Sequence, residues 1–341
     1  MRATIKDIAA KANLSVTTVS LVLNNKPCKI PEETRRLVQK IADELHYYPN
    51  QLAVGLIKKR TQTIGLIVSD ISNSFFAGLT KGIENECRKN HRTLIVCDSN
   101  DQFERDLEYI TVLASKNADG IVYCMSRDTD LERFYKVQSL LEQFAVPYVM
   151  LDRSFDLPGV YIVRVDHVTG GYLAARHLLE LGHRRIACVT GPMNLVDCRD
   201  RLQGYRKALE EYGVPFDQEL MIEGTYEMES GVLAADNLQG KDFSAVFAFD
   251  DMMAYGLYHG LKRHGLSIPE DVSVVGYDDI FPSAILDVPL TTVHQPIQQL
   301  GAEAVRKLLA VVDHRDTVEA SSLLIPELVV RKSTAPPGHG G

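Results

Sequence analysis

The stretch TIKDIAAKANLSVTTVSLVLNN, residues 4–25, has the pattern of two short helices joined by a tight turn. Asn13 stands at the turn, and asparagine tolerates the left-handed backbone that such a turn needs. The side-chain oxygen of Ser15 can cap the second helix. A helix, a tight turn and a second helix predict a helix-turn-helix unit. The expected inward faces consist of Ile8, Ala9 and Ala12, then Val19, Val22 and Leu23.

A third helix is expected after Pro31, because proline near the start and the acids Glu32 and Glu33 in the first turn favour a helix N-terminus. Its expected buried stripe is Leu37, Ile41 and Leu45. An ordinary helical mini-domain would explain these apolar positions equally well. It would not explain why Ser15, Thr17, Thr18 and Ser20 crowd one short helix.

Charge separates this head from the rest of the chain. Residues 1–60 hold 11 Lys and Arg against 5 Asp and Glu, a net of +6, and the remainder holds 26 against 40, a net of −14. A basic head on an acidic body indicates that the head alone meets a polyanion. The alternative is a small basic domain that has no such partner.

From Thr63 onward, apolar runs alternate with amphipathic stretches. Near-continuous apolar strands with helices between them predict parallel sheets covered on both faces. Two successive units, residues 62–162 and 163–290, predict an α/β core of two doubly wound subdomains. The expected strands are IGLIV, TLIVCD, GIVYCM, PYVML, RIACVT, AVFAF and VSVVGY.

Polar and aromatic residues follow several of these strands, and open parallel sheets bind ligands at the carboxyl ends of their strands. Carboxylates, a guanidinium and aromatic rings together suit a sugar, because each charged group can take two hydroxyls and a ring can stack on the sugar. Capping of the following helix is the alternative for Asp251 and Asp279, and Phe75 or Phe76 could belong to the core. The candidate segments are 70–76, 152–153, 191–201, 250–251 and 278–279.

Several classes of protein are disfavoured. No apolar run is long enough to span a membrane, and the first residues lack the pattern of a signal peptide, so a cytoplasmic protein is expected. The six cysteines show no CxxC and are expected to be reduced. The histidines lack metal-ligand spacing and are interpreted as surface or loop residues. Without nucleotide-binding, hydrolase or zinc-protease motifs, we expect no enzyme, no metal and no cofactor.

The residues 4–25, then IPEETRRLVQKIADELHYYPN and TIGLIVSDISNSFFAGLTKGIE, resemble the lactose/galactose repressor (LacI/GalR) family of bacterial regulators. The resemblance continues through LGHRRIACVTGP, RLQGYRKAL, VSVVGYDDI and PLTTVHQP to about Lys332, and the ribose- and purine-repressor branch is nearest. It implies a periplasmic-binding-protein-like core whose chain crosses between subdomains again near Thr291 and Ser321. The implied domains are a helix-turn-helix head 1–48, a hinge 49–61 and a core 62–332, and the Pro/Gly-rich composition of the tail 333–341 predicts disorder there. Within the core, one subdomain comprises 62–162 plus 292–321, and the other 163–291 plus 322–332.

The resemblance implies a sequence-specific DNA-binding regulator whose affinity for double-stranded operator DNA changes with a small effector. It is expected to be a repressor and a homodimer. Leu21 stands where the family commonly has Arg or His, so it can offer only apolar contact to a base. Val54-Gly55 replaces the usual Arg-Ser of the hinge, and glycine disfavours a helix, so we expect a hinge that depends strongly on DNA. The implied DNA contacts are Thr4, Ser15, Val16, Thr17, Leu21, Asn24, Leu56 and Lys58.

The implied effector contacts are Asn73, Phe75, Phe76, Asp152, Arg201, Tyr226, Asp250 and Asp278. Leu195 occupies the position of the base-reading Arg of purine-binding members, which argues against a purine bound in that way. A sugar phosphate would meet mostly acids, so a neutral sugar such as ribose is favoured over a purine, a nucleoside or a sugar phosphate. A sugar-binding protein without DNA binding is an alternative that the basic head disfavours.

Overall fold

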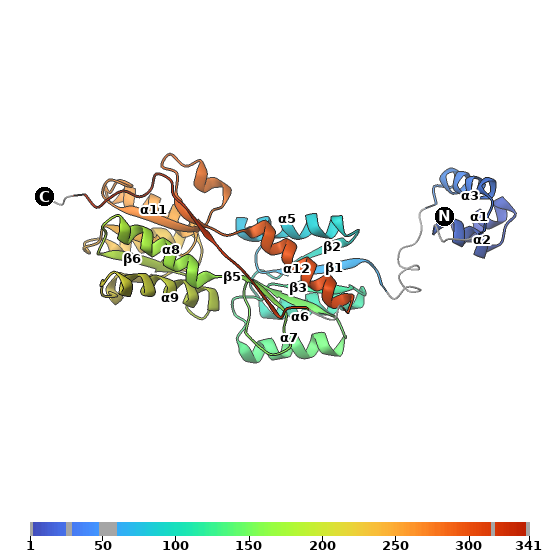
Figure 1. Cartoon of the computed structure of the whole chain (residues 1–341), viewed down its shortest axis with the longest axis horizontal. Coiled ribbons are helices and arrows are strands. Elements are labelled where there is room, and N and C mark those ends of the chain that lie inside the picture. The colour runs from blue at the N-terminus through green and yellow to red at the C-terminus, as the bar shows by residue number, and fades with distance from the viewer. Residues whose placement is uncertain (1–2, 25–28, 48–59, 315–317, 339–341) are drawn as a thin grey trace. The chain divides into compact units, whose positions relative to one another are not determined.

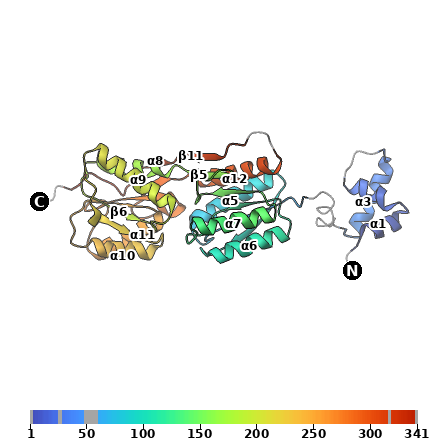
Figure 2. The ribbon, with the colours of Figure 1, turned by 90° about the horizontal axis from the view of Figure 1, so that it is seen from below.

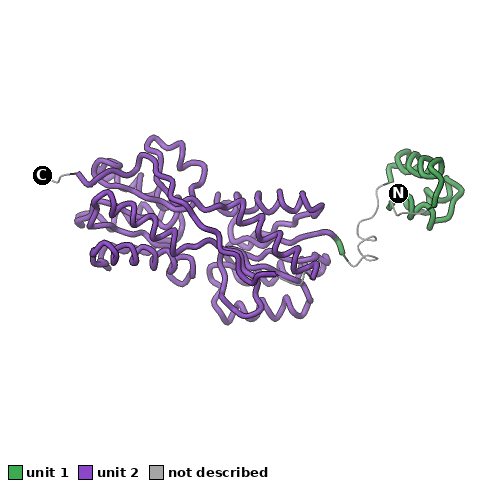
Figure 3. The backbone as a smooth tube through the Cα atoms, in the orientation of Figure 1, with its two compact units in different colours: residues 1–61 green, residues 62–341 purple. Residues whose placement is uncertain are grey.

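The computed structural model describes residues 3–24, 29–47, 60–314 and 318–338. The chain divides into two compact units, residues 1–61 and 62–341, which are coloured separately in Figure 3. The hinge predicted for residues 49–61, including Leu56 and Lys58, lies almost entirely outside the described residues. No described helix is both long enough and apolar enough to cross a membrane.

The first unit contains α1 (Ile5–Ala12), α2 (Val16–Leu23) and α3 (Glu32–Glu44), packed around one small apolar core. The predicted inward faces of α1 and α2 are confirmed, although Leu23 is only partly buried. The prediction for α3 was wrong at Leu37, which is 44% exposed. Its buried stripe instead includes Val38, Ile41 and Ala42, which follow the i, i+3, i+4 spacing of a helix face.

The turn between α1 and α2 has the local chemistry expected for it. Asn13 adopts the left-handed conformation, with φ 54° and ψ 44°, and ends α1. The Oγ of Ser15 accepts a hydrogen bond of 3.0 Å from the backbone N–H of Thr18 and caps α2. Both predictions are confirmed.

The second unit holds two sheets, each covered by helices on both faces (Figure 1). The first sheet has the order β11-β5-β4-β3-β1-β2, and its neighbouring strands are parallel. Helices α5 (Ser74–Lys89) and α12 (Ile297–Val312) pack together on one face, while α6 (Phe103–Ser115) and α7 (Leu131–Gln143) cover the other. Its strands are β1 (Thr63–Val68), β2 (Thr93–Asp98), β3 (Gly120–Tyr123), β4 (Tyr148–Leu151), β5 (Ile162–Val165) and β11 (Ser321–Leu324).

The second sheet has the order β12-β10-β9-β8-β6-β7, in which β10 and β12 are antiparallel and the other neighbours are parallel. Helices α8 (His167–Glu180) and α9 (Val196–Glu211) pack together on one face, and α10 (Met228–Leu238) and α11 (Asp251–Arg263) on the other (Figure 2). Its strands are β6 (Ile186–Thr190), β7 (Met221–Glu223), β8 (Ala245–Ala248), β9 (Ser273–Asp278), β10 (Thr291–His294) and β12 (Glu327–Val329). The short helices η1 (Gln218–Leu220) and η2 (Phe281–Ala284) complete the subdomain.

The predicted fold class is therefore confirmed, but the predicted subdomain boundaries lie a few residues too early. The chain changes sheets after β5, after β10 and after β11. Boundaries at residues 162, 291 and 321 would separate these three strands from the sheets with which they pair. Pairing decides where a crossing strand belongs, and the sequence alone does not contain the partner's position.

The tail also differs from its prediction, which placed disorder from residue 333. The hydroxyl of Ser333 donates to the carbonyl of Val274 at 2.6 Å and accepts from the N–H of Thr291 at 2.7 Å. The N–H of Ala335 donates to Ser273 Oγ at 3.0 Å. These hydrogen bonds attach residues 333–335 to the second sheet, since they satisfy polar groups that its buried strands would otherwise leave unpaired.

Candidate functional site

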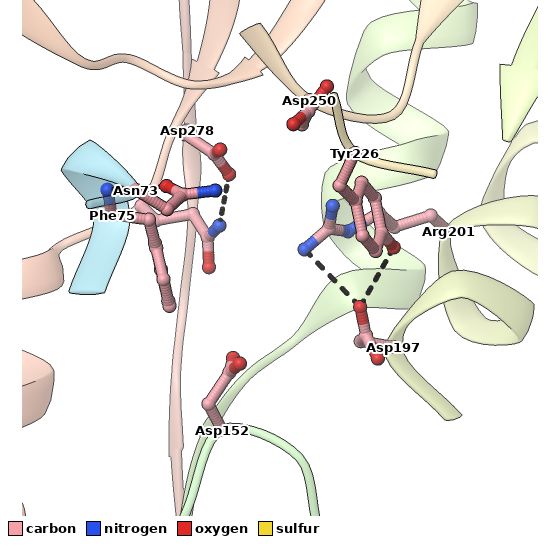
Figure 4. A pocket seen from close by; sticks show the side chains of 9 residues that line it. Asn73, Phe75, Asp152, Asp197, Arg201, Tyr226, Asp250 and Asp278 are labelled. Carbon is pink, nitrogen blue, oxygen red and sulfur yellow. Dashed lines mark hydrogen bonds and ion pairs between the residues drawn. The ribbon is translucent and has the colours of Figure 1, made fainter. Parts of the chain in front are cut away.

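A cavity lies between the two subdomains, where the carboxyl ends of strands from both sheets meet (Figure 4). It receives side chains from the start of α5, from the loops after β4 and β7, from α9, and from the ends of β8, β9 and β10. All of the predicted effector residues except Phe76 line it. The complete lining is Asn73, Phe75, Asp152, Asp197, Arg201, Tyr226, Asp250, Asp278 and Gln295.

Phe76 does not line the cavity and lies in the core of the first subdomain. Its ring makes an edge contact with Phe75, at 5.1 Å between centroids, and the Arg153 guanidinium lies 5.6 Å from its centroid. Consecutive helical residues point about 100° apart, so Phe75 and Phe76 cannot both face the same cavity.

Arg201 is the cation of the cavity and is fixed from several sides. Its side chain is 6% exposed and lies over the ring of Tyr277, 4.0 Å from the centroid. Its Nη1 donates to the carbonyl of Phe249, its Nε donates to His167 Nδ1 at 3.3 Å, and its Nη2 lies 3.8 Å from Asp197. Because these contacts hold the guanidinium in one place, it can present a defined pair of donors to a ligand.

Two lining residues are absent from the implied effector contacts, although Asp197 falls within the candidate segment 191–201. Asp197 lies one helical turn before Arg201, and one of its oxygens accepts a hydrogen bond of 2.9 Å from the Tyr226 hydroxyl. That i, i+4 spacing was a usable signal. Gln295 follows β10 and donates to Asp278 at 2.6 Å. It could have been found only by recognising TTVH as a strand.

His167 was expected at the surface or in a loop, but it is buried beside the cavity. Its Nδ1 lies 3.0 Å from the Tyr277 hydroxyl, and its Nε2 lies 3.8 Å from Asp152. The imidazole therefore connects the surroundings of Arg201 to Asp152, which comes from the other subdomain.

Two acids of the second subdomain, Asp250 and Asp278, line the cavity and have a raised pKa. Asp250 lines the cavity and also caps α11, since its Oδ1 accepts from the N–H of Met253 at 2.8 Å. Burial raises the pKa of Asp250 to about 7, against the opposing effects of that hydrogen bond and of Arg201. Burial also raises the pKa of Asp278, with the nearby acids adding to the effect and Arg201 opposing it.

Asp251 was weighed as a helix cap, but the structure gives it a different position. Its carboxylate accepts hydrogen bonds from the N–H of Ile280 at 3.0 Å and from the hydroxyls of Ser283 and Thr292 at 2.6 Å each. It thus joins the start of α11 to η2 and to β10. Asp279 pairs with Arg331 at 2.6 Å and with His294 at 3.0 Å, and therefore does not serve as a cap either.

Three lining residues have a left-handed backbone: Asp152 with φ 65°, Tyr226 with φ 65° and Asp278 with φ 113°. This conformation is unfavourable for residues other than glycine, and such strain is concentrated at binding sites. Each residue follows or ends a strand, so the unusual backbone turns its side chain into the cavity.

The cavity retains unpaired hydrogen-bonding capacity. Within the described part of the chain, three buried acceptor atoms of lining residues have no hydrogen-bond partner: Asp152 Oδ1, Asp197 Oδ1 and Gln295 Oε1. Its free space is about 40 Å³, which is room for a few water molecules. Among the residues the structure describes, no group of three or more His, Cys, Asp or Glu is placed to hold a metal ion.

In the first unit, the predicted DNA-contacting residues surround α2 and the start of α1. Thr4 precedes α1, and its N–H and hydroxyl both donate to Asp7 at 2.8 Å. Val16 and Thr17 are exposed at the start of α2, while Leu21 is half-buried. Asn24 ends α2, and its amide donates to the carbonyl of Ser20 at 2.8 Å. Val16, Thr17 and Asn24 are thus exposed on α2, and their contact with DNA stays a prediction.

A two-sheet core with a polar cavity between its subdomains and a separate helix-turn-helix head defines a class of protein, the ligand-controlled DNA-binding regulators. Two family models match this chain. Residues 4–50 match the bacterial regulatory proteins of the lacI family, and residues 61–333 match the periplasmic binding proteins and sugar binding domain of the LacI family. The chain belongs to the LacI family, and it is a DNA-binding transcriptional regulator with a small-molecule effector.

Individual relatives agree with this assignment. The transcriptional repressor PurR of Vibrio atlanticus is 37% identical over 334 residues, which cover 97% of this chain and 98% of that protein. The Lac repressor dimer bound to operator and the anti-inducer ONPF has 28% identity and a TM-score of 0.89, over 98% of this chain and 100% of that one. A LacI-family regulator from Enterococcus faecium with bound ribose has 34% identity and a TM-score of 0.73, over 80% and 99% of the two chains. These relatives are regulators and repressors, in agreement with the prediction that the chain is not an enzyme.

Proposed function

We propose that the effector of this regulator is a neutral sugar, with D-ribose as the first candidate. The observation that carries the proposal is the set of unpaired acceptors at Asp152, Asp197 and Gln295. Buried acceptors without donors are costly, so a ligand that supplies O–H donors gains most from this cavity. A sugar ring supplies such donors around its edge, while Phe75 and Tyr226 offer apolar faces to the ring.

The charge of the cavity favours the same ligand over a phosphorylated one. Arg201 faces four lining carboxyl groups, and a phosphate carries acceptors and negative charge but no donor that these oxygens need. The ribose-bound regulator from Enterococcus faecium supports the choice of a pentose by analogy.

A purine is the second candidate, because the PurR repressor of Vibrio atlanticus is 37% identical to this chain. Leu195 weakens this alternative. It stands where the purine-binding members have a base-reading arginine, and it is buried and apolar. A purine ring would also leave fewer donors for the three unpaired oxygens.

Titration calorimetry of the full chain with D-ribose, hypoxanthine, guanine and ribose 5-phosphate tests the proposal. D-ribose should bind, and replacing Arg201 or Asp278 by Ala should abolish its effect on operator affinity while operator binding without sugar is kept. Asp70→Asn is a matched control, because Asp70 follows β1 but does not line the cavity. Binding of hypoxanthine or guanine, without binding of D-ribose, would transfer the assignment to the purine alternative.

We further propose that the regulator is a cytoplasmic homodimer that represses by binding a two-fold symmetric operator. One short recognition helix buries little DNA surface, so two heads on two half-sites are needed for specific binding. The loop after β9 carries Phe281 and Ile285, which are 77% and 65% exposed, and this apolar surface suits contact with a second copy. The Lac repressor, the structural relative described above, binds its operator as a dimer.

In this proposal Val16, Thr17 and Leu21 face base edges. The N-terminal ends of α1 and α2, at Thr4 and Ser15, approach phosphates. Asn24, Leu56 and Lys58 complete the proposed contacts. An operator duplex is first selected by this protein from random DNA sequences. The affinity for that duplex should fall steeply as the salt concentration rises, because phosphate contacts release counterions. An affinity that does not change with salt would refute DNA binding by the basic head.

A further inference from the structure

A single guanidinium connects the two subdomains beside the cavity. Arg127 lies in the loop between β3 and α7 of the first subdomain. Its Nη1 donates to the carbonyl of Thr225 at 3.4 Å, and its Nη2 lies 4.0 Å from Glu227 Oε1. These two partners flank Tyr226 in the sequence. Arg127 therefore contacts the backbone of Thr225, before the tyrosine, and the side chain of Glu227, after it.

Arg127 also contacts the second loop that brings cavity residues from the other subdomain. The amide of Asn194 donates to the carbonyl of Arg127 at 2.8 Å. Asn194 precedes α9, which carries Asp197 and Arg201. We call the contacts of Arg127 with Asn194, Thr225 and Glu227 the latch.

Within the first subdomain, Asp101 fixes the position of Arg127. Asp101 accepts from the N–H of Arg127 at 2.9 Å and pairs with its Nε at 3.1 Å. The same carboxylate pairs with the buried Arg153 at 2.7 Å. Burial opposes ionisation of Asp101, but Arg153 and Arg127 outweigh it and hold the pKa of the carboxyl below its usual value. A charged and doubly paired Asp101 restricts the position from which Arg127 reaches across.

The topology places the latch far from the connections between the subdomains. The crossing strands β5 and β11 lie at one edge of the first sheet, and β10 and β12 lie at one edge of the second. Tyr226 follows β7, which forms the opposite edge of the second sheet. A rotation about the crossing strands would therefore move the atoms at β7 more than those beside the crossings.

The tyrosine flanked by the latch contacts forms part of the cavity wall. Its hydroxyl donates to Asp197 at 2.9 Å, and its ring packs so closely on Gly191 that a Cβ there would lie 2.1 Å from a ring carbon. The remaining free space of about 40 Å³ is too small for a pentose. Movement of segment 225–227 away from the first subdomain would enlarge this space.

We propose that Arg127 is a positioning residue that holds segment 225–227, and with it Tyr226, over the cavity, so that the ligand enters and leaves when the latch opens. The ligand's identity rests on the proposed function, but the motion of the segment does not. The latch opens readily, because the ion pair of Arg127 with Glu227 joins side chains that are 37% and 61% exposed, and such pairs are weak.

Hydrogen exchange of the full chain without any sugar tests the latch directly. The informative amides are those of Gly224 and Thr225, which donate to Thr190 O at 2.8 Å and to Ser230 Oγ at 3.1 Å. Arg127→Ala should speed their exchange about twofold to fivefold, as the loss of an exposed charged contact implies. Arg127→Lys should give an intermediate rate, since one ammonium cannot reach both partners.

Arg133→Ala is the matched control. The side chain of Arg133 is 36% exposed and pairs with Asp128 at 2.7 Å, within its own subdomain. It should leave the two amides unchanged. Unchanged exchange in Arg127→Ala, or an equal increase in Arg133→Ala, would overturn the proposal. If Arg127→Ala does not fold, Glu227→Gln removes the exposed partner charge and decides the question by the same exchange measurement.

Stopped-flow binding of D-ribose adds a second measurement. Arg127→Ala should raise both the association and the dissociation rate by a similar factor, since the latch acts on access. A change confined to the dissociation rate would assign Arg127 to ligand contact and overturn the positioning role. If the unaltered chain does not bind D-ribose, the proposed effector fails, and the exchange rates still decide whether the latch exists.

Discussion

Replacing Asp250 by Asn removes a buried acid from the wall of the cavity while preserving its shape. Asparagine is also a favourable helix cap, so its side-chain oxygen can still accept from the N–H of Met253 at the start of α11. What disappears is the cost of ionising a carboxyl group that is 3% exposed. The variant should therefore be more stable than the unaltered protein at neutral pH.

The size of the effect follows from the raised pKa. The folded protein keeps the Asp250 proton up to about pH 7, whereas the ordinary value for the unfolded chain is 3.8. Folding therefore takes up a proton between these values, and stability falls as pH rises through this window. The free energy of unfolding should fall by about 1.4 kcal/mol per pH unit in this window. The whole interval corresponds to roughly 4 kcal/mol. This figure is an upper bound, because Arg201 and the neighbouring acids respond to the change.

Urea unfolding of both proteins at pH 5, 6, 7 and 8 measures this difference. The stability of Asp250→Asn minus that of the unaltered chain should grow from pH 5 to pH 7 and level off above it. Asp130→Asn is the matched control, because Asp130 is an exposed cap of α7 that accepts from the N–H of Arg133 at 2.8 Å. A difference for Asp250→Asn that does not vary with pH would refute the argument from burial.

Three further substitutions test packing and polar contacts in the second subdomain. Gly204→Ala places a Cβ 2.0 Å from the carbonyl of Val168, so α8 and α9 must separate, and unfolding in urea should show a loss of about 2 kcal/mol or more. Asp251→Ala leaves one buried N–H and two hydroxyls without their acceptor and should cost about 2–4 kcal/mol, measured as a lower melting temperature; an unchanged melting temperature would contradict its structural role. Tyr226→Phe removes the O–H donor to Asp197 and should cost about 1 kcal/mol in urea unfolding while leaving the ring in place, whereas a larger loss would mean that the ring itself has moved.

Much of the core could be predicted from the sequence because its strands are continuous apolar runs. Strand β1 and strand β8 are nearly or wholly buried along their length, so the hydrophobic pattern alone marks them. Strands β7 and β12 have three residues each and contain no fully buried side chain. They form because β6 and β10 offer unpaired edges, and those partners lie 25 or more positions away in the chain, beyond the reach of a local pattern.

The adjacent acids Asp250 and Asp251 show where reasoning from strand ends reaches its limit. Both follow β8, and the sequence predicts that one faces the ligand while the other caps a helix. In the structure Asp250 performs both tasks, because a cap at the start of α11 already points out of the carboxyl end of the sheet. The next residue is rotated by about 100° along the new helix, which directs Asp251 away from the cavity and toward Ile280, Ser283 and Thr292. The end of β8 thus connects the cavity to η2 and β10. Asp251 anchors the loop that bears Phe281 and Ile285, and it is the next residue after Asp250, which lines the cavity.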